Sequence, residues 1–404
     1  MIATFVTQAP MTGMTETADQ IFVLLKHWVV GYLPVGLQGI ASVLISVVAI
    51  IAVFPTLFAL AVWMERKGLA RIQNRRGPNR VGPFGLLQPI ADGIKSLTKE
   101  DIVPLSADAV VHFMAPVVLV VVVFMGIAVL PMGRNMTLVS MDAGLLFFFA
   151  MGASTELSVF MAGWSSRNKY SLLGAMRGVA QMISYEVPLL MSSVAVVMIT
   201  GSLSLDKIVE AQNKYTWGLP HWNIFTPWGL AAFVMYAVAA TAETNRSPFD
   251  LPEGESELVA GYFTEYSGFK FALFFLGEYV GMLSISGLGT TLFLGGWSAP
   301  FAFLGWVPSW IWFFGKVMLS IAVFIWVRGT LPRLRQDQLM NFAWKFVLPF
   351  TLLDLMVAAA WRFMGDGWVR WVVCSAVLLG AYALMGGVGM RGEHFGRRKY
   401  RYAE

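Results

Sequence analysis

The sequence predicts an all-α polytopic membrane protein with about nine transmembrane helices and one amphipathic helix at the membrane surface. Of its 404 residues, 57% are hydrophobic and only 13% are charged. A soluble domain cannot bury that much apolar surface, so the composition indicates membrane residence. Long apolar runs separated by short polar connections support the same fold class.

Nine apolar runs approach or exceed the length needed to cross about 30 Å of hydrocarbon. They are residues 38–63, 110–131, 144–163, 179–200, 228–244, 271–296, 308–329, 342–361 and 368–390. The run at 228–244 is the least certain, because it is short and ends in polar and acidic residues. The runs divide the chain into an N-terminal segment (1–37), a core membrane domain with eight spans and cytoplasmic loops (38–361), and a ninth span with a basic tail (362–404).

Residues 85–101 have the pattern of a helix that lies on the membrane surface. Their leucine and isoleucine residues recur at helical spacing, with charged residues between them. These apolar positions are Leu86, Leu87, Ile90, Ile94 and Leu97.

The distribution of lysine and arginine predicts the orientation of the spans. The connections after spans 1, 3, 5 and 7 and the C-terminal tail carry 21 of the 29 basic residues, with Arg328 at the end of the seventh span counted in the connection after it. The N-terminal segment and the other connections carry six, with Arg370 at the start of the ninth span counted in the connection before it, and the remaining two lie within spans. Because basic residues accumulate on the cytoplasmic side, we expect the N-terminus outside and the C-terminus in the cytoplasm.

Three glutamates lie inside predicted spans at one depth. Glu156 is seven residues before the end of the third span, and Glu186 and Glu278 lie seven residues after the starts of the fourth and sixth. At 1.5 Å per residue, all three are about 10 Å below the cytoplasmic boundary. Glu243 closes the fifth span just above them. Ionisable groups inside a membrane are costly and generally mark a function or an ion pair.

An acidic cytoplasmic connection lies next to these three glutamates. The stretch SPFDLPEGESELVAGYFTEYSGF (247–269) holds five carboxylates, which are Asp250, Glu253, Glu255, Glu257 and Glu265. Neighbouring carboxyl groups that are partly withdrawn from water titrate as a coupled set. The pattern therefore predicts a proton relay or an electrostatic trigger; the alternative is that each acid forms a structural hydrogen bond.

Lys316 and Asp354 form a second intramembrane charge pattern. They lie at similar depth in the seventh and eighth spans, which we expect to form a hairpin. Opposite charges buried at equal depth predict a structural ion pair. A role for the two residues in a proton path is the alternative.

The sequence offers no redox centre of its own. The single cysteine, Cys374, excludes a disulfide framework and an iron–sulfur cluster held by this chain alone. The four histidines lack ligand spacing, and a GxGxxG match at 387–392 follows a span rather than a strand. We therefore expect no catalytic residue, metal or bound cofactor in this chain, and expect the redox chemistry on a partner.

Four blocks carry a family resemblance. They cover residues 65–101, 162–186, 242–279 and 327–340, and include ERKGLARIQNRRGPNRVGPFG and VRGTLPRLRQDQLM. In these blocks the chain resembles the H-subunit family of bacterial proton-pumping NADH–quinone oxidoreductase (complex I), the counterpart of mitochondrial NADH dehydrogenase subunit 1. The resemblance covers roughly residues 38–361. Because the family usually has eight spans, the ninth departs from its pattern.

The resemblance implies a quinone access channel coupled to proton translocation. It places four residues at the portal and channel: Glu65, Arg66, Asp92 and Arg328. It assigns a charged path into the membrane to Glu186, Glu243, Asp250, Glu253, Glu255, Glu257 and Glu278, to which Glu156 is added for its depth.

The resemblance also implies a setting for the chain. It is expected in the bacterial inner membrane, with its N-terminus periplasmic. A hydrophilic arm is expected on its cytoplasmic face and other membrane subunits beside it. Quinone is then the substrate, whereas flavin, iron–sulfur clusters and NADH belong to partner subunits.

Two other functions stay open from the sequence. One is the membrane anchor of a related hydrogenase complex, which shares the anchor but has a hydrogen-evolving partner. The other is a stand-alone proton-coupled transporter, for which inverted repeats and broken helices would be expected. No internal repeat is visible in the sequence, and its acids gather on one side of the membrane.

Overall fold

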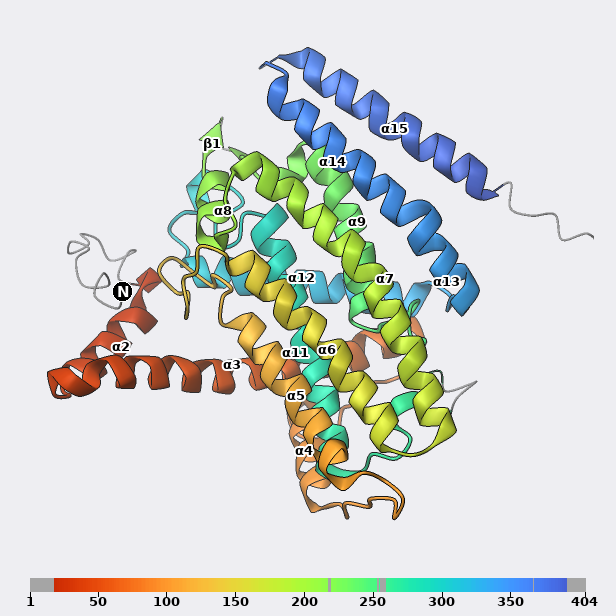
Figure 1. The fold of residues 1–404 in the computed structure, drawn as a ribbon. Helices are drawn as coiled ribbons and strands as arrows, with labels where there is room; N and C mark the ends of the chain where they lie inside the picture. Colours follow the sequence, from red (N-terminus) through yellow and green to blue (C-terminus); the bar gives the residue numbers. More distant parts are fainter. Residues whose placement is uncertain (1–17, 217–218, 253, 255–258, 366, 391–404) are drawn as a thin grey trace, which may run out of the picture.

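Long apolar helices make up most of the protein, which confirms the predicted all-α class (Figure 1). The computed structural model describes residues 18–216, 219–252, 254, 259–365 and 367–390. The helices are α2 (Ile21–Gly31), α3 (Val35–Ile72), α4 (Gln88–Thr98), α5 (Ala109–Ile127), α6 (Gly144–Ser165), α7 (Lys169–Thr200), α8 (Leu205–Gln212), α9 (Pro227–Glu243), α11 (Gly268–Phe293), α12 (Ser309–Thr330), α13 (Gln336–Phe342), α14 (Leu348–Phe363) and α15 (Trp368–Met390). Two two-residue strands, β1 (Tyr215–Thr216) and β2 (Leu219–Pro220), pair antiparallel.

Eight helices in the described part of the chain are long and apolar enough to cross a membrane. Each of them coincides with a predicted span. The remaining predicted span, 228–244, is the 17-residue helix α9. At 1.5 Å per residue α9 covers only about 26 Å, slightly less than the hydrocarbon thickness.

Two helices extend well beyond the apolar runs that predicted them. α3 continues to Ile72 rather than ending at 63, and α7 begins at Lys169 rather than at 179. The Asn168 side chain caps α7 by accepting a hydrogen bond from the Tyr170 amide. Hydropathy marks the hydrocarbon layer, whereas helical hydrogen bonding continues into the polar region beside it. The extension of α3 carries Glu65 and Arg66.

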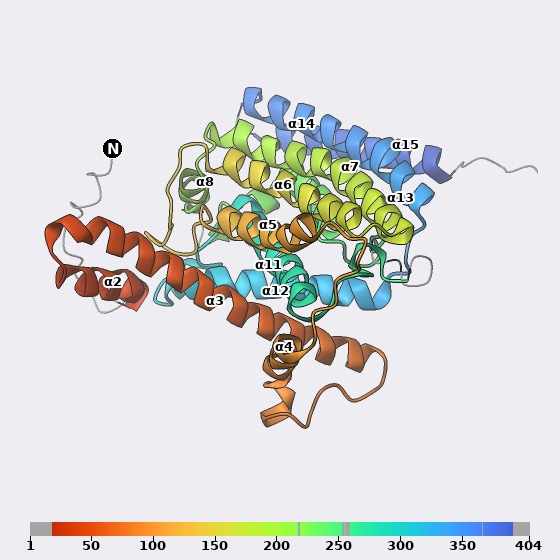
Figure 2. The ribbon, with the colours of Figure 1, turned by 60° about the horizontal axis from the view of Figure 1, so that its bottom comes forward.

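The bundle is layered, as two views show (Figures 1 and 2). α6 packs between α5 and α7, and α11 packs against α5. On the far side of α7 lie α9 and α14, and α15 covers both. α12 packs against α3 and α11, while the N-terminal half of α3 extends out of the bundle with α2 folded against it.

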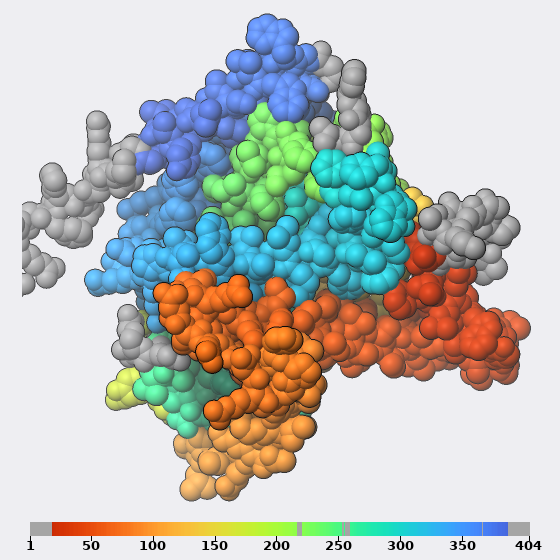
Figure 3. Space-filling model, turned by 180° about the vertical axis from the view of Figure 1, so that it is seen from behind, coloured from red at the N-terminus to blue at the C-terminus, as the bar shows by residue number. Residues whose placement is uncertain are grey.

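α4 is an amphipathic helix within the stretch where its pattern predicts one. It packs against α3 and α11, and its face with Ile90, Ile94 and Leu97 remains exposed. Seen from behind, α4 and the segment that leads to it lie below α12 (Figure 3). The glycine-rich segment before α4 is tightly folded, because a Cβ at Gly85 (φ 77°) would lie 2.3 Å from the Pro78 carbonyl oxygen.

Candidate functional site

Glu65 is the centre of a buried polar cluster at the junction of three helices. Its side chain is nearly inaccessible to solvent. One carboxylate oxygen accepts a hydrogen bond from the Tyr279 hydroxyl of α11 at 2.7 Å. The other forms an ion pair with the Arg328 guanidinium of α12. Hydrogen bonds to charged groups are the strong ones, so α3, α11 and α12 are tied together at this point.

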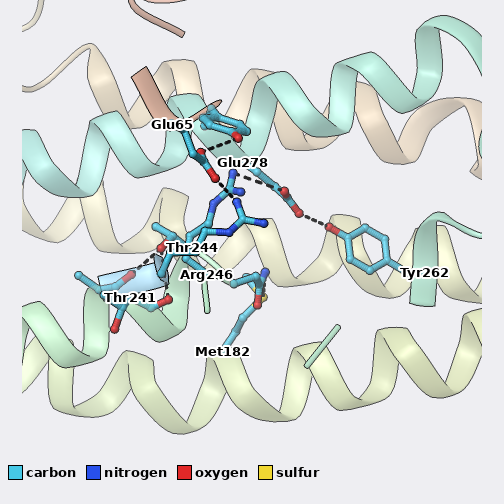
Figure 4. A network of polar contacts seen from close by, with 11 residues as sticks. Glu65, Met182, Thr241, Thr244, Arg246, Tyr262 and Glu278 are labelled. Carbon is cyan, nitrogen blue, oxygen red and sulfur yellow. Dashed lines mark hydrogen bonds and ion pairs between the residues drawn. The ribbon is translucent and has the colours of Figure 1, made fainter. Parts of the chain in front are cut away.

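Arg246, in the turn after α9, extends the cluster toward the interior (Figure 4). Its guanidinium carbon lies 4.0 Å from the centre of the Tyr279 ring, a cation–π contact. Its Nη2 lies 4.0 Å from Glu278 Oε2, and the Tyr262 hydroxyl donates to Glu278 Oε1 at 2.8 Å. Each group from Glu65 to Tyr262 thus contacts the next.

The turn that carries Arg246 is fixed by a glutamine of α7. The Gln181 amide nitrogen donates to the carbonyls of Ala242 and Phe249, each at 2.7 Å. Between them Asn245 adopts the left-handed conformation (φ 50°), which asparagine tolerates better than most residues. The turn therefore holds Arg246 buried beside α11.

A cavity of about 80 Å³ lies beside the cluster, between α5, α6, α7 and α11. Its wall is mostly apolar but includes Glu186, Glu243 and Glu278, together with Thr155. One water molecule needs about 10–15 Å³ of such volume, so the cavity has room for several. Three of the predicted acids therefore share one space that water can fill.

Glu156 joins this group through a neighbouring helix. Glu156 is close enough to Glu186 for the two carboxyl groups to interact electrostatically. Glu243 is close enough to both to interact electrostatically. In such a set, adding one proton changes the proton affinity of the others.

The residues predicted for the portal and channel form two ion pairs that start from consecutive positions of α3. Glu65 pairs with Arg328, as described. Arg66 pairs with Asp92 of α4 at 2.5 Å, and Asp92 also accepts a hydrogen bond from Gln88 at 3.2 Å. These four residues therefore join α3 to α12 through one ion pair and α3 to α4 through the other.

The acids of the 247–269 connection are only partly described. Glu253, Glu255 and Glu257 lie outside the described residues. Asp250 is half-buried, and its main-chain carbonyl accepts a hydrogen bond from Arg333. Glu265 accepts from the Asn168 amide at 2.6 Å and so supports the start of α7.

Four cluster residues, Gln181, Arg246, Tyr262 and Tyr279, were not among the predicted site residues. Tyr279 is adjacent to Glu278, a position that is about 100° away around the helix, so the two point to different partners. A tyrosine next to an intramembrane acid is the sequence signal that could have identified it. Gln181 gives a similar signal, because a glutamine inside an apolar run needs a buried partner.

The predicted ion pair between Lys316 and Asp354 is wrong. The Lys316 ammonium instead donates to three main-chain carbonyls. Asp354 forms no ion pair with any residue of the described chain, and its Oδ1 lacks a hydrogen-bond partner there. The two spans do not form the expected hairpin, because α12 packs mainly on α3 and α11, whereas α14 packs on α7, α9 and α15.

No group of three or more histidine, cysteine or acidic side chains is placed to hold a metal ion within the described ranges. The chemical capacity of the site is instead that of hydrogen-bonded, coupled carboxyl groups next to two arginines. Such groups bind, share and release protons.

Comparisons with known proteins identify the family of this chain. The NADH dehydrogenase family matches residues 45–359, which include every residue of the cluster. The chain is 51% identical over 298 residues to the H subunit of NADH-quinone oxidoreductase from Dehalococcoides mccartyi, covering 74% of this chain and 80% of the relative. It is 46% identical over 347 residues to the second H subunit of NADH-quinone oxidoreductase from Syntrophobacter fumaroxidans, covering 83% and 98%. The resemblance stated from the sequence is thereby confirmed, and the chain belongs to the NADH dehydrogenase family, alongside the H subunits of bacterial NADH-quinone oxidoreductases.

Proposed function

We propose that this chain is the membrane subunit of a NADH–quinone oxidoreductase that forms the quinone access channel and couples quinone reduction to proton translocation. The observation that carries the proposal is the unbroken series of contacts from the Glu65–Arg328 pair, through Tyr279 and Arg246, to Glu278 and the cavity. It joins the residues assigned to the channel with those assigned to the proton path.

The quinone end lies where α3, α4 and α11 meet. The exposed apolar face of α4 suits the lipid-dissolved tail of a quinone, and the two ion pairs of α3 offer charged groups to its head. Reduction of a quinone to a quinol consumes two electrons and two protons. The electrons come from a partner, and acids of this chain lie within the same region as the channel to supply or replace protons.

Arg246 is the element that passes a charge change onward. It contacts Glu278 on one side and, on the other, the ring whose hydroxyl binds Glu65. Negative charge gained at the quinone end attracts Arg246 and weakens its interaction with Glu278. Glu278 then binds a proton more readily, and the carboxyl groups around the cavity respond as a coupled set.

The remaining assignments complete the proposal. The end of the bundle with α4 faces the cytoplasm, where a hydrophilic arm carries the flavin, the iron–sulfur clusters and the NADH site. Other membrane subunits lie laterally, in a bacterial inner membrane with the N-terminus periplasmic. Asp250 and the acids at 253, 255 and 257 are assigned to the same proton path.

The test compares two glutamate variants in membrane vesicles that hold the whole complex. Glu278→Gln removes the charge that contacts Arg246, and Glu210→Gln on α8, an exposed position, is the matched control. Quinone reduction and proton uptake are recorded together, and the assembled complex is quantified by native electrophoresis. We expect Glu278→Gln to lower the number of protons moved per NADH oxidised while the complex still assembles. An unchanged proton-to-electron ratio would contradict the proposal.

A further inference from the structure

The Lys316 ammonium lies in a cage of carbonyl oxygens at the end of α11 opposite to Glu278. Its Nζ donates to the carbonyls of Leu294, Gly296 and Ser298 at 2.7, 2.9 and 2.7 Å. It also lies 4.2 Å from the centre of the Trp222 ring. Carbonyl oxygens only accept hydrogen bonds, and a neutral amine has two N–H donors, so three such contacts require the charged ammonium.

The cage is held in shape by bonds in which Lys316 takes no part. The amide of Gly296 donates to the Thr290 carbonyl at 2.9 Å, and that of Gly295 donates to Gln212 Oε1 at 3.2 Å. The Trp222 indole donates to Ser298 Oγ at 2.8 Å. These contacts fix the loop from both sides, so its carbonyls converge whether or not an ammonium lies between them.

The backbone of this loop is one that glycine permits. Gly295 and Gly296 have φ values of 67° and 53°, which directs their neighbours' carbonyls inward. A Cβ at Gly295 would lie 2.4 Å from Trp222 Nε1, so the glycine also lets the indole approach. The loop and the indole therefore form a single built structure.

We propose that this loop is a binding site for a monovalent cation of the primary-ammonium class, which Lys316 occupies as a permanent, covalently attached ligand. Converging carbonyl dipoles and an aromatic face are the two features that attract a compact cation of single charge. Among the described residues, no ion pair supplies an acidic partner to Lys316. Carbonyl dipoles and the Trp222 ring thus offset the cost of burying the ammonium.

Occupancy of the site fixes α12 along its axis. Lys316 attaches one part of α12 to the loop after α11, and Arg328 lies twelve residues further along the same helix. At 1.5 Å per residue, the two residues are about 18 Å apart along the helix axis. The attachment at Lys316 therefore also sets the position along this axis at which Arg328 pairs with Glu65. The proposal of a cation site does not depend on the proposed function, because it is argued from the contacts of Lys316 alone.

The test is chemical rescue of an emptied cage in membranes that contain the assembled complex. Lys316→Ala removes three carbons and the ammonium, and added propylammonium supplies the same four atoms. Loss of three charge-assisted hydrogen bonds is expected to speed thermal inactivation of quinone reductase activity by about tenfold or more. We expect propylammonium, but not 1-propanol, to reverse most of that loss.

Lys316→Met is the matched control, since its side chain fills the space without supplying a charge. It should be as labile as Lys316→Ala but insensitive to propylammonium. Equal effects of propylammonium and 1-propanol, or equal effects on both variants and the unmodified chain, would overturn the proposal. If Lys316→Ala does not accumulate, cells are grown with propylammonium or 1-propanol and the assembled complex is quantified. Accumulation with the ammonium alone supports the site, and any other result contradicts it.

Discussion

Replacing Tyr279 by phenylalanine tests the central link of the contact series. The change removes only the hydroxyl that donates to Glu65 at 2.7 Å, and it keeps the ring that faces the Arg246 guanidinium. Glu65 then keeps its ion pair with Arg328. Tyr279→Phe thus leaves the buried Glu65 carboxylate with one of its two partners. We expect this loss to weaken any binding that depends on the charge of Glu65.

The expected magnitude follows from the kind of bond that is lost. Hydrogen bonds to charged groups contribute about 1.5–3 kcal/mol. At about 1.4 kcal/mol per factor of ten, Tyr279→Phe should lower kcat/KM for quinone by roughly 10- to 100-fold. If the loss arises at Glu65, Tyr279→Phe should cost little more in a Glu65→Gln background. The effects of the two changes should therefore fall short of additivity by more than about 0.5 kcal/mol.

A double-mutant cycle in membrane vesicles measures this coupling through NADH-driven quinone reduction. Tyr236→Phe is the matched control, because Tyr236 is also buried and its hydroxyl donates to the Ile285 carbonyl at 2.8 Å, away from Glu65. Tyr236→Phe and Glu65→Gln should add. Additive losses for Tyr279→Phe and Glu65→Gln would refute the argument that this hydroxyl acts through Glu65.

Three further predictions concern residues around the same series. Glu186→Gln combined with Glu255→Gln should lower proton pumping more than it lowers assembly, since both acids belong to the proposed path; normal pumping in vesicles would argue against it. Arg66→Asp should raise the KM for quinone. It should have little effect on thermal stability, because the ion pair between Arg66 and Asp92 is partly exposed. Adding Asp92→Arg reverses the order of the charges in this pair and should restore the KM. Asp354→Asn should leave assembly intact and thermal inactivation unchanged or slower, because the buried Asp354 Oδ1 lacks a partner in the described chain; faster inactivation would reveal an ionic role.

The sequence predicted where the spans lie along the chain more reliably than how they pack around the bundle. Apolar runs mark the hydrophobic segments, so they located the spans, and distance from a span's end predicted that Glu186 and Glu278 lie at one level. Those two line the same cavity, because α7 and α11 both border it. Lys316 and Asp354 are also at one level, yet their helices lie on different sides of the bundle. Which helices pack together depends on long-range contacts that periodicity does not contain.

In the contact series from Glu65 to Glu278, Tyr279 and Arg246 were harder to predict from the sequence than the glutamates. A glutamate inside an apolar run is conspicuous because of its cost. Tyr279 is amphipathic and fits an apolar helix without conflict, so only its hydroxyl contact reveals its role. Arg246 lies in a connection whose basic residues are equally well explained by orientation, until its contacts with Tyr279 and Glu278 are seen.

The position of Glu278 suggests how the acidic connection influences the membrane interior. Its two carboxylate oxygens are contacted by Arg246 and by Tyr262, which flank Asp250 and the acids at 253, 255 and 257 in the sequence. Glu65, Arg328 and Glu278 itself are carried by helices that pack against each other, whereas these two contacts of Glu278 come from the segment between α9 and α11. On the proposed proton path, a change of charge at Asp250 acts on the segment that supplies these two partners of Glu278. We therefore expect protonation of Asp250 to alter the hydrogen bond and the ion pair of Glu278 together.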